Sequence, residues 1–243
     1  MPPNTVTIPP MPRRLLVPNL HPGPLPLPLD QAHHARDVLR LTQGEEVELF
    51  TPDGRSALAR LTTVNHEIVV ATVEEILAPA ASSQLTIASA IPKGARADWM
   101  IEKLSELGVA RFIPLQTERS VVHPEGKGKL DRWERLAEES AKQSHRTGVM
   151  QISPLVTLHK FLSALPAHSP VAYLSTARGA LPLPRWLGPA SPCLLIGPEG
   201  GWSPGELANF ETRRLTPLTL GATILRVETA AIAAAAIVSA YTP

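Results

Sequence analysis

The sequence predicts an α/β protein in which a small β-barrel precedes a larger domain with a mainly parallel sheet. Three strand patterns follow one another closely between residues 46 and 73, as is typical of a small barrel. From residue 85 onward, strand patterns alternate with helical patterns, which is typical of a parallel sheet covered by helices. A stretch rich in Ala, Pro and Ser at residues 78–83 separates these two regions and has the composition of a linker.

The N-terminal region combines prolines with strand patterns. Ten of the first 28 residues are proline, which excludes regular helix there and predicts a proline-broken loop up to Pro28. Residues 1–10 are expected to be a disordered extension. The elements expected next are strands at residues 13–17, 46–50, 56–61 and 67–73, and a short helix at residues 32–41 that Gly44 closes.

In the second domain, the hydrophobic spacing switches repeatedly between that of a strand and that of a helix. The expected strands are residues 85–90, 112–115, 171–174, 193–197 and 218–220. The expected helices are residues 95–107, 130–146, 204–212 and 229–240.

The composition is that of a folded chain. Of 243 residues, 44% are apolar, which suffices for a core, and the net charge of +1 gives no overall signature of nucleic-acid binding. No apolar run approaches the roughly 18 residues needed to cross a membrane. Prolines stand where a signal peptide would be apolar, so we expect a cytoplasmic protein. The single cysteine, Cys193, excludes an intrachain disulfide and is expected to pack as a small apolar residue.

The most informative pattern is a buried strand that runs into a glycine-rich loop and then into a helix, at residues 193–206. Ser203 suits the N-cap, Pro204 the first helical position, and Glu206 completes a capping box. The three glycines of the loop let the backbone approach a ligand closely. This loop lies at the carboxyl end of a strand, where open α/β sheets bind ligands. A purely structural tight turn is the alternative interpretation.

A second pattern lies at residues 220–230 and leads into an almost wholly apolar helix. Such a helix must be buried in a core or an interface. Arg226 and Glu228 are therefore anomalous at its start. They indicate a functional site, a salt bridge at the helix N-terminus, where the helix dipole favours a carboxylate, or both together.

Together the two patterns resemble the signature of the SPOUT-class methyltransferases. Ile-Gly-Pro-Glu-Gly-Gly at residues 196–201 is followed by Leu-Gly-x-x-Ile-Leu-Arg-x-Glu-Thr-Ala at residues 220–230. Within that class, the chain is most similar to the bacterial family that makes N3-methyluridine in small-subunit (16S) ribosomal RNA. The similarity runs in order through residues 11–240, and includes residues 93–94, 100–109, 114–120 and 133–146. Ser144-His145 departs from it, because other members often carry glycine second.

The resemblance implies a C-terminal SPOUT α/β domain with a deep trefoil knot at residues 83–243, a rare exception to unknotted topology. It also implies a PUA-like barrel at residues 11–78 that grips RNA. The implied partners are 16S ribosomal RNA, within the small ribosomal subunit, and a second copy of the chain bound through the knotted domain. The apolar terminal helix independently favours a dimer, since its bare face needs a partner. Neither a metal nor a membrane is implied.

The implied cofactor is S-adenosyl-L-methionine. The residues expected to bind it are Leu174, Ser175, Ile196, Gly197, Pro198, Glu199, Gly200, Gly201, Leu220, Gly221, Ile224, Leu225, Arg226, Glu228, Thr229 and Ala230. The implied reaction methylates N3 of uracil, a poor nucleophile until its proton is lost. Arg226 would then stabilise the developing anion, and Glu199 would act as the base or position the base edge. A loop-bracing carboxylate is the alternative role of Glu199.

RNA is expected to meet basic side chains and to present an unstacked base. The expected phosphate contacts are Arg13, Arg14, Arg36, Arg40, Lys93, Arg119 and Arg146. Trp202 is a candidate to stack on the base, with a core or rim role as the alternative. Two other functions stay open: methylation of a ribose 2′-hydroxyl, and a non-catalytic RNA-binding or ribosome assembly factor. The N-terminal barrel disfavours the first, and the intact glycine loop disfavours the second.

Overall fold

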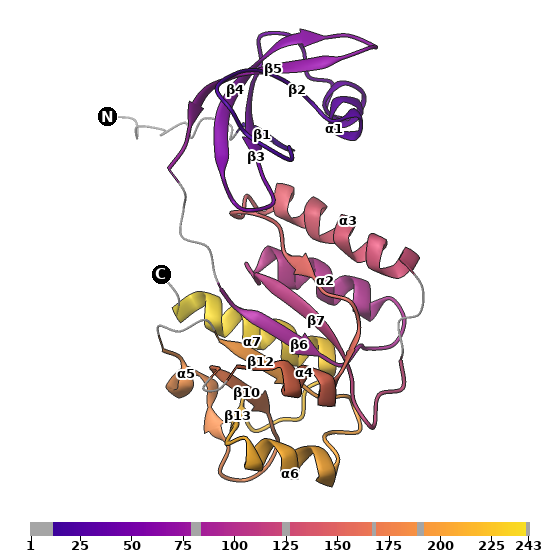
Figure 1. Cartoon of the computed structure of the whole chain (residues 1–243), viewed down its shortest axis with the longest axis vertical. Helices are drawn as coiled ribbons and strands as arrows, with labels where there is room; N and C mark the ends of the chain where they lie inside the picture. Colours follow the sequence, from indigo (N-terminus) through magenta and orange to yellow (C-terminus); the bar gives the residue numbers. More distant parts are fainter. Residues whose placement is uncertain (1–11, 79–83, 123–126, 167–168, 189–191, 242–243) are drawn as a thin grey trace, which may run out of the picture. The chain divides into compact units, whose positions relative to one another are not determined.

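The computed structural model describes residues 12–78, 84–122, 127–166, 169–188 and 192–241 (Figure 1). The chain divides into two compact units, Met1–Ala80 and Ala81–Pro243. The extension expected at residues 1–10 lies outside the described residues. Among the described helices, none is both long enough and apolar enough to cross a membrane.

The first unit is one five-stranded sheet with a short helical segment. Its strands lie in the order β1-β3-β4-β5-β2, with β1 parallel to β3 and the other neighbours antiparallel. A single core of buried Leu, Val and Ala side chains, drawn from all five strands and from α1, holds this unit together. The elements are β1 (Arg13–Leu16), β2 (Gly23–Pro26), α1 (Leu29–His33), β3 (Glu46–Phe50), β4 (Ser56–Val64) and β5 (Val69–Ile76).

Strand β2 forms where the sequence predicted only a proline-broken loop. Just beyond it, the backbone N–H of Leu27 donates to the carbonyl of Val69 in β5 (2.9 Å). Backbone N–H groups along a strand point alternately to its two sides, so the N–H of Leu25 also points toward β5. The backbone nitrogens of Pro24 and Pro26, which carry no hydrogen, point away from β5. β2 is the edge of the sheet, so its prolines remove no hydrogen bond from a ladder.

The helix expected at residues 32–41 begins earlier and consists of two pieces. Pro28 fixes the backbone directly before α1, and the chain then widens into one π-helical segment, η1 (His34–Val38). Arg36 of η1 donates to the carbonyls of Asn65 (2.9 Å) and His66 (3.1 Å), in the turn between β4 and β5. These bonds tie the helical segment to that hairpin.

The second unit is built on one parallel sheet in the order β11-β13-β10-β12-β6-β7-β8, with β9 beside β7. Its main strands are β6 (Thr86–Ser89), β7 (Arg111–Gln116), β10 (Val171–Leu174), β12 (Cys193–Ile196) and β13 (Thr216–Thr219). The short strands are β8 (Gln151–Ile152), β9 (Val156–Thr157) and β11 (Leu181–Pro182). The helices are α2 (Arg96–Glu106), α3 (Lys127–Gln143), α4 (Leu158–Ala164), α5 (Leu183–Trp186), α6 (Pro204–Thr212) and α7 (Val227–Tyr241).

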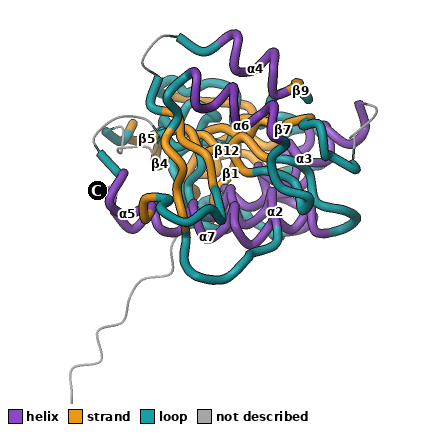
Figure 2. Tube along the Cα trace, turned by 90° about the horizontal axis from the view of Figure 1, so that it is seen from below, coloured by secondary structure: helices purple, strands orange, loops and turns teal. Residues whose placement is uncertain are grey.

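Helices cover both faces of this sheet. Buried side chains of α2, α3, α5 and α7 share one core with the sheet, and those of α4 and α6 form a second core on the other face. Figure 2 shows α2 and α7 on one side of the strands and α4 and α6 on the other. This is the α/β layering that the alternating pattern predicted.

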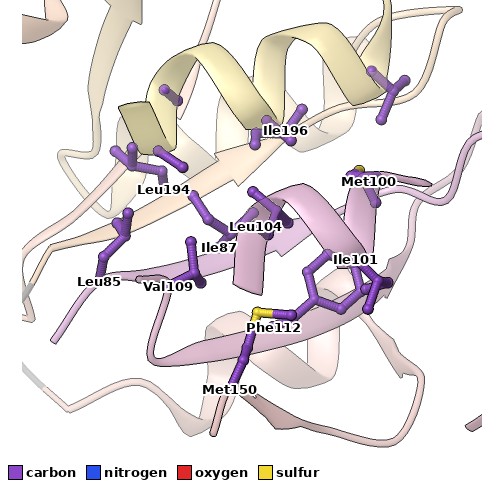
Figure 3. Close-up of a cluster of buried hydrophobic side chains, with 14 of the residues drawn as sticks. Leu85, Ile87, Met100, Ile101, Leu104, Val109, Phe112, Met150, Leu194 and Ile196 are labelled. Carbon is purple, nitrogen blue, oxygen red and sulfur yellow. The ribbon is translucent and has the colours of Figure 1, made fainter. Parts of the chain in front are cut away.

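Alternation along each strand divides its side chains between the two cores. In β12, Leu194 and Ile196 enter the core with α2 and α7, whereas Leu195 enters the core with α4 and α6. Figure 3 shows Leu194 and Ile196 near Ile87 of β6 and Leu104 of α2, within the larger core. Strands apolar on both faces are expected of a parallel sheet covered on both sides.

All five strands expected in this unit form within two residues of their predicted bounds. The elements that the sequence did not indicate (α4, α5, β8, β9 and β11) are too short to show a periodic pattern. The helix expected at residues 130–146 is α3, which ends at Gln143. His145 then adopts φ 52°, a left-handed conformation usual for glycine at this place after a helix. The trefoil knot stays a prediction of the resemblance.

Candidate functional site

A cavity of about 480 Å³ opens where three neighbouring strands of the second unit end. Its lining comes mainly from the segments after β10, β12 and β13, which lie side by side in the sheet with β10 in the middle. Because the strands are parallel, their carboxyl ends meet at one edge, where α/β sheets bind ligands. The volume is within the range of small-molecule sites.

The glycine loop after β12 forms one wall of this cavity. Gly197 must lack a side chain, because a Cβ there would lie 2.9 Å from the indole ring of Trp202. Gly201 has φ 70°, which side chains disfavour. The indole Nε1 of Trp202 donates to the carbonyl of Leu174, the last residue of β10 (2.9 Å). The loop is thus fixed against the neighbouring strand.

Trp202 is a structural part of the wall. Its ring meets the rings of Phe210 (centroids 5.0 Å apart, planes at 85°) and Tyr173 (6.4 Å, 86°). Edge-to-face packing on two sides and the bond to Leu174 leave the ring no freedom to follow a substrate base. The rim role therefore fits Trp202 better than stacking on RNA.

The start of α6 is the predicted capping box. The Ser203 hydroxyl accepts from Glu206 N (3.1 Å), and Glu206 Oε2 accepts from Ser203 N (2.8 Å). The other oxygen, Oε1, accepts from the backbone N–H of Glu118 (2.9 Å), in the turn after β7. Although Glu206 is only 7% exposed, both of its oxygens have donors, as a buried carboxylate requires.

The turn after β7 also contacts the glycine loop directly. Arg119 Nη1 donates to the carbonyls of Gly200 (2.8 Å) and Trp202 (3.3 Å). Its side chain therefore lies along the outside of the loop. Arg119 is exposed, as an RNA contact would be, but it also bonds the glycine loop, which the sequence did not indicate.

The segment after β13 closes the cavity from the other side, and α7 begins at Val227. Glu228 does not line the cavity. Its side chain is 5% exposed, and Oε1 pairs with Arg96 Nη1 of α2 (3.3 Å). Of the two interpretations of the charges at this helix start, the salt bridge is correct for Glu228, but its partner is Arg96 and not Arg226.

Most of the residues expected to bind the cofactor line the cavity, and three do not: Arg226, Glu228 and Thr229. The lining residues that were expected are Leu174, Ser175, Ile196, Gly197, Pro198, Glu199, Gly200, Gly201, Leu220, Gly221, Ile224, Leu225 and Ala230. The lining residues missing from that set are Thr176, Ala177, Trp202, Leu207, Leu218, Thr219, Thr223 and Val227. Most of these missed residues lie in or directly beside the segments that were expected to bind the cofactor, so proximity in sequence could have indicated them.

The two side chains expected to act in catalysis are both exposed. Glu199 lines the cavity, and Arg226 directly precedes α7. Within the described part of the chain, neither side chain makes a hydrogen bond or an ion pair. Both side chains are therefore unengaged, and Glu199 lies in the wall of the cavity whereas Arg226 lies outside its lining.

Two of the basic residues expected to contact RNA are structural. The Arg14 side chain is 4% exposed, pairs with Glu48 (3.1 Å) and lies 4.1 Å from the centre of the Phe50 ring. Arg146 donates to the carbonyls of Ser105 and Val109 (both 2.9 Å). Burial lowers the pKa of the Arg146 guanidinium to about 10.

The other basic residues differ in exposure. Arg13, Arg40, Lys93 and Arg119 are exposed, whereas Arg36 is half-buried. Within the described residues, no group of His, Cys, Asp and Glu side chains could hold a metal ion. Burial raises the pKa of the Cys193 thiol to about 12, which leaves it protonated and unreactive at neutral pH.

Comparison with known proteins relates both units to RNA methyltransferases. The model of the family described as "RNA methyltransferase domain" matches residues 79–239, and that of the "RNA methyltransferase PUA domain" matches residues 27–74. The chain is 31% identical to Ribosomal RNA small subunit methyltransferase E of Bacillus subtilis, over 88% of each chain. It is also 31% identical to the protein of that name from Synechocystis, over 86% of this chain and 71% of the relative.

Solved structures show the same similarity. Ribosomal RNA small subunit methyltransferase E of Neisseria gonorrhoeae, solved with S-adenosyl methionine, has a TM-score of 0.85 and 30% identity, over 95% of this chain and 98% of that one. A protein of Legionella pneumophila, solved with bound SAM, has a TM-score of 0.82 and 30% identity, over 94% and 97% of the two chains. The predicted fold class is confirmed by three findings: the parallel α/β sheet, the SPOUT-type relatives and the PUA-type N-terminal domain.

Proposed function

The chain belongs to the ribosomal RNA small subunit methyltransferase E family, and we propose that it transfers a methyl group from S-adenosylmethionine to RNA of the small ribosomal subunit. One observation carries the proposal: the glycine loop and two neighbouring strand ends enclose a cofactor-sized cavity at the carboxyl edge of the parallel sheet. Two relatives that share 30% of the sequence over nearly the full chain were solved with this cofactor.

The cavity offers the two kinds of surface that this cofactor needs. Partly exposed apolar side chains of the lining, among them Leu174, Leu220 and Leu225, suit the flat adenine ring. Backbone groups of the glycine loop suit the polar ribose and methionine parts, since the loop lets a ligand approach the main chain. Glu199 would place a negative charge near the amino or sulfonium group.

For the reaction itself, we propose methylation at N3 of a uridine. N3 loses its proton to Glu199 or to a water that Glu199 positions, and the nitrogen then attacks the methyl carbon. The carbon–sulfur bond breaks, and S-adenosylhomocysteine leaves as a neutral thioether. Arg226 would stabilise the uracil anion that precedes transfer, because a cation is most effective where charge develops. Both side chains are free for these roles, as no described residue engages them.

We further propose that two copies of the chain associate through the second unit. Ile224 is a large apolar residue with 85% of its surface exposed, in the segment that lines the cavity. Helix α7, which begins just after this segment, also leaves Tyr241 exposed at its far end (64%). Burial against a second copy would remove this apolar surface from water. Sedimentation of the protein and of Ile224→Asp tests this: the variant should be monomeric, and an unchanged dimer would contradict the assignment.

The substrate RNA would meet the exposed Arg13, Arg40, Lys93 and Arg119, and binding should weaken steeply with added salt. A relation to bacterial enzymes acting on the ribosome also leads us to propose a cytoplasmic location. The test of function is transfer of labelled methyl from S-adenosylmethionine to unmodified small ribosomal subunits, followed by nuclease digestion and mass spectrometry. A methyl group on the uracil base is the expected result. A ribose methyl would favour the 2′-hydroxyl alternative, and no transfer to any RNA would favour a binding factor.

A further inference from the structure

Arg119 reaches the glycine loop from a distant part of the sheet. It follows β7, which is separated from β12 by β6, yet its guanidinium contacts two carbonyls of the loop that follows β12. The contact is close along the side chain as well. A Cβ at Gly200 would lie 3.4 Å from Arg119 Cβ and 3.5 Å from its Cδ, so the arginine stem packs against that glycine.

The turn that carries Arg119 is itself fixed. Ser120 Oγ accepts from Thr117 N (3.0 Å) and bonds the Thr117 hydroxyl (2.9 Å), which closes the turn. Glu118 N donates to the buried carboxylate of Glu206 at the start of α6. The arginine thus projects from a rigid base toward the loop. The bond from Trp202 to Leu174 fixes the loop to β10. The bonds from Arg119 fix it from the other side, to the turn after β7.

Only one nitrogen of the Arg119 guanidinium is used in these bonds. Nη1 donates to both carbonyls, whereas Nε and Nη2 bond to no described residue, and the side chain is exposed. A guanidinium is a flat fork of five N–H groups, so its unused edge can bind the oxygens of a phosphate while Nη1 stays in place. An RNA phosphate there would meet a cation already oriented by the cofactor loop.

We propose that Arg119 is a positioning residue that braces the cofactor loop and binds an RNA phosphate, so that cofactor and RNA raise each other's affinity. This rests on the proposed function. A phosphate that immobilises the guanidinium also immobilises the loop carbonyls. The loop then loses less conformational entropy when the cofactor binds, so the cofactor binds more tightly. By linkage, the factor by which RNA strengthens cofactor binding equals the factor by which the cofactor strengthens RNA binding.

The test compares three variants of the full chain. Arg119→Ala removes both roles. Arg119→Lys keeps the charge but lacks the planar fork that joins two carbonyls and a phosphate at once. Arg111→Ala is the matched control, because Arg111 is an exposed arginine at the opposite end of β7 and its side chain bonds, among the described residues, only the Gln151 side chain. Calorimetry gives the affinity for S-adenosylhomocysteine, which has no methyl group to transfer, with and without unmodified small ribosomal subunits.

Arg119→Ala should bind the cofactor product about tenfold more weakly (about 1.4 kcal/mol) and lose the strengthening by subunits. Its subunit affinity should also have a smaller salt dependence, by about one phosphate contact. Arg119→Lys should show the weaker cofactor binding but keep the salt dependence. Arg111→Ala should match the wild type in both.

Three results would overturn the inference: equal cofactor affinity in Arg119→Ala and Arg111→Ala, a strengthening by subunits that survives in Arg119→Ala, or a melting temperature of ligand-free Arg119→Ala well below that of Arg111→Ala. The last result would mean a general structural role. Failure of the proposed function gives a different signature, since the wild-type protein itself would then bind neither S-adenosylmethionine nor its product.

Discussion

Replacing Gly197 by alanine is the sharpest single-atom test of the cavity wall. The added Cβ would lie 2.9, 3.1 and 3.3 Å from three atoms of the Trp202 indole, whereas ordinary contacts begin at 3.4 Å. The ring or the loop must therefore move by about half an ångström. The ring has little room for this, because Phe210 and Tyr173 pack against it. A shift would also stretch the 2.9 Å bond from Trp202 to Leu174.

Overpacking of this kind typically costs about 1–3 kcal/mol. If cofactor binding requires the undistorted loop, this strain also weakens binding, and the affinity should fall by about fivefold to about 150-fold. Calorimetric titration with S-adenosylmethionine and thermal unfolding measure the two effects. Gly128→Ala is the control: it makes the same substitution near the start of α3, where a Cβ would have nothing within 4 Å. Wild-type cofactor affinity and stability in Gly197→Ala would refute the geometric reasoning.

Four further tests address other features. Trp202→Phe removes the donor to the Leu174 carbonyl, so unfolding free energy should fall by about 1–3 kcal/mol and cofactor affinity should fall with it; an unchanged melting curve would contradict the bond. His145→Gly should stabilise the protein by about 1 kcal/mol, because glycine adopts the observed φ of 52° without strain, and chemical denaturation measures this. Iodoacetamide at pH 8.5 should modify Cys193 in urea but not in the native protein, since burial raises the thiol pKa from 9.0 to about 12. By the same linkage, native stability should decline as the pH rises above 9 towards 12, because the unfolded thiol ionises first, and Cys193→Ala should lose this component.

Most residues that the sequence assigned to cofactor binding line one cavity, because the walls of that cavity are short, contiguous segments. A strand followed by Gly-Pro-Glu-Gly-Gly and a capping box determines its own local path, and parallel strands bring the ends of such segments together. The same locality explains the strand predictions. The short α4 and α5 have no room for a repeat, and the prolines of β2 conceal an edge strand whose partner lies more than forty residues away.

What the sequence could not indicate are contacts that join distant elements. Arg119 with the glycine loop, Glu206 with the turn after β7, and Arg96 with Glu228 each link residues far apart in the chain. Each side chain is an ordinary surface type when considered alone. Arg14 shows the reverse error, because two basic residues in the expected first strand suggested RNA contact, whereas strand alternation turned the Arg14 side chain inward onto Phe50.

The structure separates the parts of the site that are fixed from those that are free. The glycine loop is held on one side by Trp202 and on the other by Arg119, and these contacts restrict the conformations that it can adopt before a ligand binds. The side chains of Glu199 and Arg226, by contrast, have no partner among the described residues. A binding site gains affinity when its walls are preorganised. If only the substrate orders the two catalytic side chains, the enzyme becomes selective for its RNA, because the correct RNA alone brings these side chains into the geometry for methyl transfer. Under the proposed function, the chain would therefore hold its methyl donor without a reacting geometry until RNA supplies the missing partners.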